Sequence, residues 1–148
     1  MSPHFGLMDA GKMTRKEAAL LRGRLHWRGG RRRLRQGKTA LGIATLYDAL
    51  LAGLRWYLLS NPRALRSASE ETDLENDAYV FTQAEEDGLF TSSADALRIR
   101  TVTAAALDDK VHPTDPEWFV AELARVLTKI KLLPFPESSL PPEDPATD

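Results

Sequence analysis

The feature that most constrains the fold is an apolar segment of 21 residues, TALGIATLYDALLAGLRWYLL, at positions 39–59. Fifteen of its residues are apolar, and Asp48 and Arg55 are the only charged ones. The segment does not alternate apolar and polar residues as a half-buried strand does, and an Asn-Pro pair follows at 61–62, so one long helix over 39–60 is predicted. A helix this apolar must be covered on most sides, which places it at the centre of a helical bundle.

The same segment also fits a membrane anchor, because a basic stretch precedes an apolar run long enough to span a bilayer. Against this, a charge near the bilayer centre costs about 2.5–3.5 kcal/mol on insertion scales, and Asp48 lies near the middle of the segment. Gly42, Ala49 and Gly53 recur at i, i+7 and i+11, which leaves a smooth face for a neighbouring helix. We therefore expect a buried bundle helix and no membrane partner.

The residues before this segment predict a first helix. Thr14 and Glu17 have the spacing of a capping box, which marks the start of a helix. The Gly29-Gly30 pair predicts a bend or break, because each glycine costs about 1 kcal/mol relative to alanine inside a helix. Gly37 is expected to end the helix in the left-handed conformation that glycine adopts easily.

Helical spacing of apolar residues predicts three further helices. They are expected over 73–87, from about residue 92 with Leu97 facing inward, and from a capping box at Thr114 to about residue 132. Nothing in the chain has the pattern of a convincing strand. The predicted fold class is all-α, a bundle of four to five helices.

The chain divides into one domain with two flanking segments. Its 148 residues suit a single domain, expected over 13–133. Residues 1–12 are expected to be flexible, and residues 134–148 form a proline-rich acidic stretch with little to bury, expected to be a disordered tail. The opening residues lack the pattern of a secretory signal, and cysteine is absent, so we expect a cytoplasmic protein without disulfides or thiolate chemistry.

The net charge of −1 conceals a strong asymmetry along the chain. Residues 1–38 hold 11 Lys or Arg against 2 Asp or Glu, whereas residues 39–148 hold 9 against 19. Acidic residues are concentrated between 70 and 87. This layout indicates either a charged partner or two parts of one fold that attract each other.

Gly37-Lys38-Thr39 matches the end of a phosphate-binding loop. The full motif also requires a glycine five residues before Gly37, because glycines let backbone N–H groups converge on the phosphate. Arg32 occupies that position, and no strand pattern precedes it. The match therefore favours a helix end over a nucleotide site.

The arginine-rich stretch is the main candidate binding site. It could hold phosphates electrostatically while its tryptophan stacks on a base. The alternative that we favour is a structural one, in which these arginines pair with the acidic residues of 70–87. The candidate residues are Trp27, Arg28, Arg31, Arg32, Arg33, Arg35 and Lys38.

No catalytic or metal site is predicted. Asp48 and Arg55 share one polar strip of the apolar helix and are a possible buried polar pair, since a buried carboxylate needs a partner. Histidines at 4, 26 and 112 are too scattered for a zinc site. We expect no metal, no cofactor and no catalytic residues.

The stretch from Ala18 to Leu59 resembles the first two helices of HEPN-type four-helix domains. It has an amphipathic helix, a Gly-Lys junction and the small-residue and aromatic helix ALGIATLYDALLAGLRWYL around Tyr47. Ribonuclease members of that family carry an arginine, four to six residues and then a histidine. Here three residues separate Arg22 from His26, so the resemblance implies a non-nuclease member that acts as a binding or partner module.

Three functions follow as hypotheses. The leading one is a non-enzymatic helical protein acting through protein–protein association, as a homodimer or with another partner, with its basic first helix against an acidic surface. The alternative is an RNA- or DNA-binding module that uses residues 28–38. A hydrolase or nuclease without local motifs is the third, and convergent polar groups in a pocket around Asp48 would favour it.

Overall fold

The computed structural model describes residues 13–61 and 74–143, and within these ranges the protein is an all-α bundle without strands. Five α-helices are followed by one turn of 3-10 helix. The elements are α2 (Arg15–Arg35), α3 (Thr39–Ser60), α5 (Asp77–Glu86), α6 (Ser93–Leu107), α7 (Asp115–Lys129) and η2 (Glu137–Ser139).

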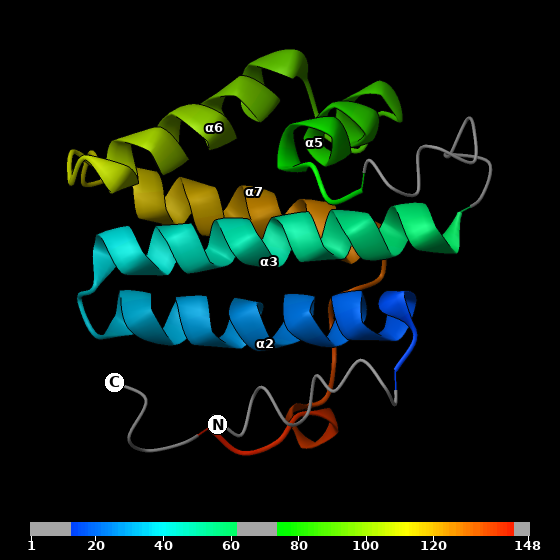
Figure 1. The fold of residues 1–148 in the computed structure, drawn as a ribbon. Helices are drawn as coiled ribbons and strands as arrows, with labels where there is room; N and C mark the ends of the chain where they lie inside the picture. Colours follow the sequence, from blue (N-terminus) through cyan, green and yellow to red (C-terminus); the bar gives the residue numbers. More distant parts are fainter. Residues whose placement is uncertain (1–12, 62–73, 144–148) are drawn as a thin grey trace.

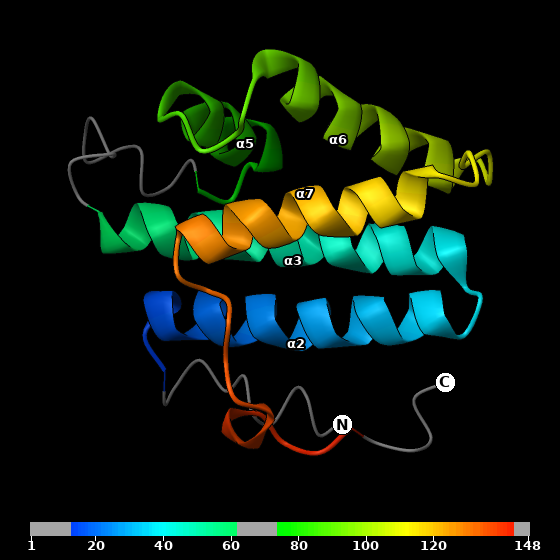
Figure 2. The ribbon, with the colours of Figure 1, turned by 180° about the vertical axis from the view of Figure 1, so that it is seen from behind.

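Helix α3 lies at the centre of the bundle, as its apolar sequence predicts. Figures 1 and 2 show α2 packed along one side of α3, α7 beside it, and α5 and α6 on the side opposite α2. Leu46, Leu50, Leu54 and Leu58 are completely buried along its length. Among the described residues, no helix has the length and apolar character needed to cross a bilayer.

Helices α2 and α3 form an antiparallel hairpin. The hydroxyl of Thr14 accepts the N–H of Glu17, which caps α2 at the predicted position. Gly37 between the helices has φ +79°, which confirms the left-handed end predicted there. The predicted bend or break at Gly29-Gly30 is wrong, because α2 continues without interruption to Arg35 and shows no kink in Figure 1.

Close packing at glycine explains why α2 stays continuous and straight enough to follow α3. A Cβ built on Gly30 would lie 2.6 Å from Cγ of Leu46, so the leucine of α3 occupies the space that a side chain would take. Leu34 fills the space beside Gly42 in the same way, and Gly53 lies against Leu127. The small-residue face of α3 is therefore confirmed, and the contact compensates for the low helix propensity of glycine.

Helices α5 and α6 cover only one side of α3. Of the third predicted helix, over 73–87, residue 73 lies outside the described residues and residues 74–76 are not helical. The observed helix begins at Asp77, capped by the side chain of Asn76. The expectation that Leu97 faces inward is wrong: its side chain is 64% exposed. Ala96 and Ile99 form the buried face of α6 instead, because a helix in the outer layer has only one side to bury.

Helix α7 begins where predicted, but without the expected capping box. Thr114 has a helical conformation (φ −88°, ψ −11°) and makes no side-chain cap bond. Its hydroxyl lies 2.9 Å from Nδ1 of His112. The hydroxyl therefore contacts this ring nitrogen and not a backbone N–H in the first turn of α7. The helix ends at Lys129, and Leu132 beyond it is fully buried.

Residues 134–143, called here the C-terminal segment, depart from the prediction of a tail with little to bury. The segment leaves the end of α7, passes α2 and reaches the side of α2 that faces away from α3 (Figures 1 and 2). Leu140 is 7% exposed, and Phe135 packs against the core. The proline and acidic residues of the segment suggested disorder. Its two apolar side chains are nevertheless packed, and its acidic residues lie near the arginines of α2.

Candidate functional site

The arginines of α2 form a continuous surface, which we call the arginine face: Arg24, Arg28, Arg31, Arg32 and Arg35. Four of them recur at i, i+4, i+7 and i+11, so the helix brings them to one side. The glycines that contact α3 lie on a different side of α2. Sequence reasoning included four of these residues but missed Arg24, whose spacing from Arg28 was the available signal.

The C-terminal segment lies on this face and supplies its acceptors. Nη1 of Arg28 donates to the carbonyl oxygen of Pro141 at 2.7 Å and lies 3.8 Å from a carboxylate oxygen of Glu137. Glu143 forms ion pairs with Arg28 and Arg32. Only 13% and 17% of the side-chain areas of the two arginines remain exposed, so these ion pairs are partly shielded from water.

An aromatic contact and a groove complete the site. The guanidinium of Arg24 lies 5.3 Å from the ring centre of Phe135, and its Nε donates to the carbonyl of Leu132. Burial there lowers the pKa of Arg24. Between α2, α7 and the C-terminal segment lies a groove of about 390 Å³, with Arg31 and Arg35 among its lining residues.

The other residues of the predicted binding site do not lie on the arginine face. Trp27 is 6% exposed and belongs to the core, so its ring is no open platform for a base. Arg33 turns toward α3, where it donates to Thr45 Oγ1 at 3.3 Å; burial, with a smaller effect of Arg32, lowers its pKa. Lys38 is exposed and occupies the N-cap position of α3 without a side-chain cap hydrogen bond.

The predicted pairing of the arginine face with residues 70–87 is wrong for the described part of that range. Arg28 and Arg32 pair with Glu137 and Glu143 instead. The physical reason is the position of α5, which lies on the other side of α3 from the arginine face (Figure 1). Arg15, at the start of α2 and outside the arginine face, has a salt bridge to this range, to Glu75 at 3.6 Å.

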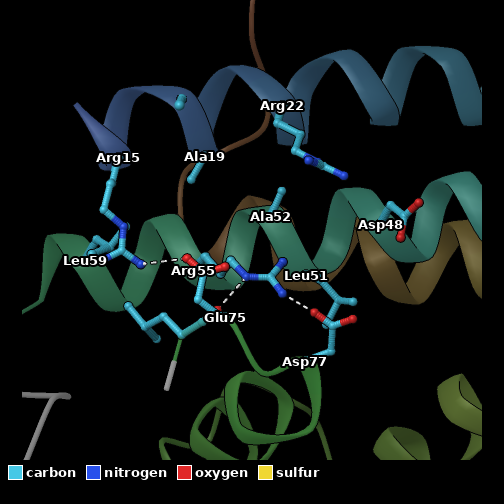
Figure 3. A pocket seen from close by; sticks show the side chains of 12 residues that line it. Arg15, Ala19, Arg22, Asp48, Leu51, Ala52, Arg55, Leu59, Glu75 and Asp77 are labelled. Carbon is cyan, nitrogen blue, oxygen red and sulfur yellow. Dashed lines mark hydrogen bonds and ion pairs between the residues drawn. The ribbon is translucent and has the colours of Figure 1, made fainter. Parts of the chain in front are cut away.

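A second candidate site, which we call the charged pocket, lies between α2, α3 and the start of α5. It has a volume of about 370 Å³ and is lined by three arginines, three carboxylates and apolar residues. Figure 3 shows Arg22 on α2 extending toward Asp48 on α3, with Arg55 and Asp77 paired nearby. Opposite charges therefore converge around an open space beside Asp48, which is the observation expected to favour the hypothesis of a hydrolase or nuclease.

The predicted pair of Asp48 and Arg55 does not form. The two residues are about 10 Å apart along the helix axis, and Arg55 instead donates to the carbonyl of Leu74 at 2.8 Å and to Asp77. Asp48 is exposed, yet the surrounding helices limit hydration of its carboxyl and raise its pKa, an effect that Arg22 partly offsets. Sequence reasoning missed Arg22 as a site residue because Asp48, the carboxylate near it, lies on another helix.

Metal-binding groups do not gather at either site. Within 13–61 and 74–143, no three His, Asp or Glu side chains form a group that could hold a metal ion. His112 contacts Thr114 at the start of α7, away from both sites. The two sites can act through charge and hydrogen bonding. The arginine face presents cations, and the charged pocket presents the cation of Arg22 and the anion of Asp48.

No protein-family model matches this chain, and the searches of curated proteins and of solved structures find no significant match.

Proposed function

We propose that the protein is a non-enzymatic helical module that acts by binding an acidic protein segment on the arginine face. The observation that carries this proposal is the position of the C-terminal segment, whose carboxylates and a backbone carbonyl are bound by Arg28 and Arg32. Guanidinium groups bind carboxylates with charge-assisted hydrogen bonds, and here they are already arranged along one helix. Arg31, Arg35 and Lys38 remain exposed beside the segment and extend the cationic surface.

The partner that the charge layout favours is a second copy of this chain. Glu85, Glu86 and Asp87 are exposed at the end of α5, across α3 from the arginine face. One molecule cannot bring these two surfaces together, whereas two molecules can. Because the surfaces lie on opposite sides, the association is head-to-tail and need not stop at a dimer. The resemblance to non-nuclease HEPN partner modules agrees with this role.

Light scattering across salt and protein concentration tests the proposal. Replacing Arg31, Arg35 and Lys38 with Gln is expected to weaken self-association about tenfold or more, because three charges are lost from the contact. A control with the same change of charge replaces three exposed lysines elsewhere, Lys16, Lys110 and Lys131. A monomer at every concentration in low salt, or equal weakening by both triple variants, would refute self-association through this face.

Nucleic acid is the alternative occupant, favoured by the same three exposed cations. Its affinity for a generic oligonucleotide would fall steeply with salt and be lost in the triple variant. The burial of Trp27 counts against it, because stacking on an aromatic ring is a main source of affinity for single strands. If the oligonucleotide binds at physiological salt while the protein stays monomeric, the alternative replaces our proposal.

A further inference from the structure

The charged pocket is separate from the arginine face, and its hollow has a structural cause. Ala18 and Ala19 on α2 and Ala52 on α3 line it, and their small side chains leave open the space that larger residues would fill. Leu51 and Leu74, both nearly fully buried, add an apolar surface to the lining. A volume of about 370 Å³ lies at the lower end of the range, about 300–1,000 Å³, of small-molecule sites.

Two of the three arginines in the pocket are already engaged. Arg55 donates to the carbonyl of Leu74 and pairs with Asp77, and Arg15 pairs with Glu75 (Figure 3). These contacts link α2 and α3 to the start of α5 and to the residues just before it. The contacts hold the lining of the pocket in place. The charged residues of the lining that make no such contact could bind a ligand.

The remaining charges are Arg22 and Asp48. In the described part of the chain neither side chain has a hydrogen bond or a salt bridge, although the charge of Arg22 is near enough to lower the pKa of Asp48. Figure 3 shows the guanidinium extending from α2 toward the carboxylate on α3. A cation and an anion thus face the same space without contacting each other.

We infer that the charged pocket binds a small zwitterion, an α-amino acid with an apolar side chain. Arg22 would donate two parallel hydrogen bonds to the ligand carboxylate, and Asp48 would accept hydrogen bonds from the ligand ammonium group. The apolar side chain would lie on the alanines and leucines of the lining. The limited hydration of the Asp48 carboxyl raises its pKa and makes the ionised form less favourable than in water, and a bound ammonium group would offset that cost.

NMR titration of the full chain with L-leucine, L-methionine and L-phenylalanine tests the inference. At least one is expected to bind with a Kd on the order of 1 mM or tighter and to shift the amide signals of Ala19 and Ala52. Two analogues of leucine each lack one charge: 4-methylpentanoate lacks the ammonium group, and 3-methylbutylamine lacks the carboxylate. Each is expected to bind about tenfold more weakly than leucine or not at all.

Variants then assign the two charges. Arg22→Gln and Asp48→Asn are each expected to weaken binding about tenfold or more. Both side chains are exposed, so the fold should tolerate the changes. The controls Lys110→Gln and Asp108→Asn make the same changes of charge at exposed residues outside the pocket and are expected to leave affinity unchanged. Absence of binding by all three amino acids, equal binding of the one-charge analogues, or equal weakening by the controls would overturn the inference. The proposed self-association does not depend on this result.

Discussion

At the scale of single residues, Tyr57 provides a polar link between α3 and the end of α5. Its hydroxyl donates to Asp87, and burial together with this hydrogen bond raises the pKa of Tyr57 to about 12. The folded protein therefore holds the phenolic proton more tightly than the unfolded chain, in which tyrosine titrates near about 10. This contribution to stability is complete below about pH 10 and is lost as the pH rises to about 12.

We expect Tyr57→Phe to lower the free energy of unfolding by about 0.5–1 kcal/mol near neutral pH, since the hydrogen bond is partly exposed. The difference from the natural chain should shrink above about pH 10, where that chain loses the contribution of Tyr57. Urea unfolding at a series of pH values measures both effects. Asp87→Ala in a double-mutant cycle is the control, and fully additive effects would contradict a shared hydrogen bond.

At the scale of elements, the hairpin of α2 and α3 depends on how closely the two helices approach. Two adjacent glycines of α2 meet different surroundings. A Cβ on Gly30 would lie 2.6 Å from Cγ of Leu46 and 3.0 Å from its backbone nitrogen, whereas a Cβ on Gly29 would meet only the end of Arg33 at 3.3 Å. The sequence gives no reason to expect the two glycines to differ. In the folded protein only Gly30 lies where a side chain would collide with α3.

Gly30→Ala is expected to reduce the free energy of unfolding by about 1–3 kcal/mol, the usual effect of overpacking a core. Gly29→Ala is the matched control, and it should be neutral or stabilise the protein by up to about 1 kcal/mol through helix propensity. Chemical denaturation of both variants gives the comparison. If Gly30→Ala were as stable as Gly29→Ala, the close contact between α2 and α3 would be refuted.

At the scale of the whole molecule, the C-terminal segment connects the end of the chain to its first described helix. Arg28 and Pro141, joined by a hydrogen bond, are 113 positions apart in the sequence. Leu140 is the buried apolar residue of this segment, and Phe135 lies beside Arg24. Arg24, Arg28 and Arg32 of the arginine face are therefore engaged within the fold, whereas Arg31 and Arg35 stay exposed.

Leu140→Ala is expected to lower the free energy of unfolding by about 1.5–3 kcal/mol, the value of burying a leucine side chain. Leu97→Ala removes the same atoms from a residue that is 64% exposed, so its effect should stay within about 0.5 kcal/mol. Urea denaturation of both variants gives the comparison. Equal, small effects would show that Leu140 does not hold the C-terminal segment on α2.

The sequence by itself determined the helices and the central place of α3. Helix formation and burial depend on local spacing, and 15 apolar residues among 21 leave few alternatives to a buried helix. The left-handed end at Gly37 and the smooth face of Gly42 and Gly53 were predictable for the same reason.

Only the tertiary structure decided which charges meet. Asp48 and Arg55 share a strip of one helix, yet Arg22 is the arginine that extends toward Asp48, and Asp77 pairs with Arg55. The arginine face contacts the C-terminal segment, whereas α5 lies on the side of α3 opposite α2. The two residues of an ion pair can lie anywhere in the sequence, so no regular spacing predicts them. Which charges meet depends on which elements the packing of apolar surfaces brings close together.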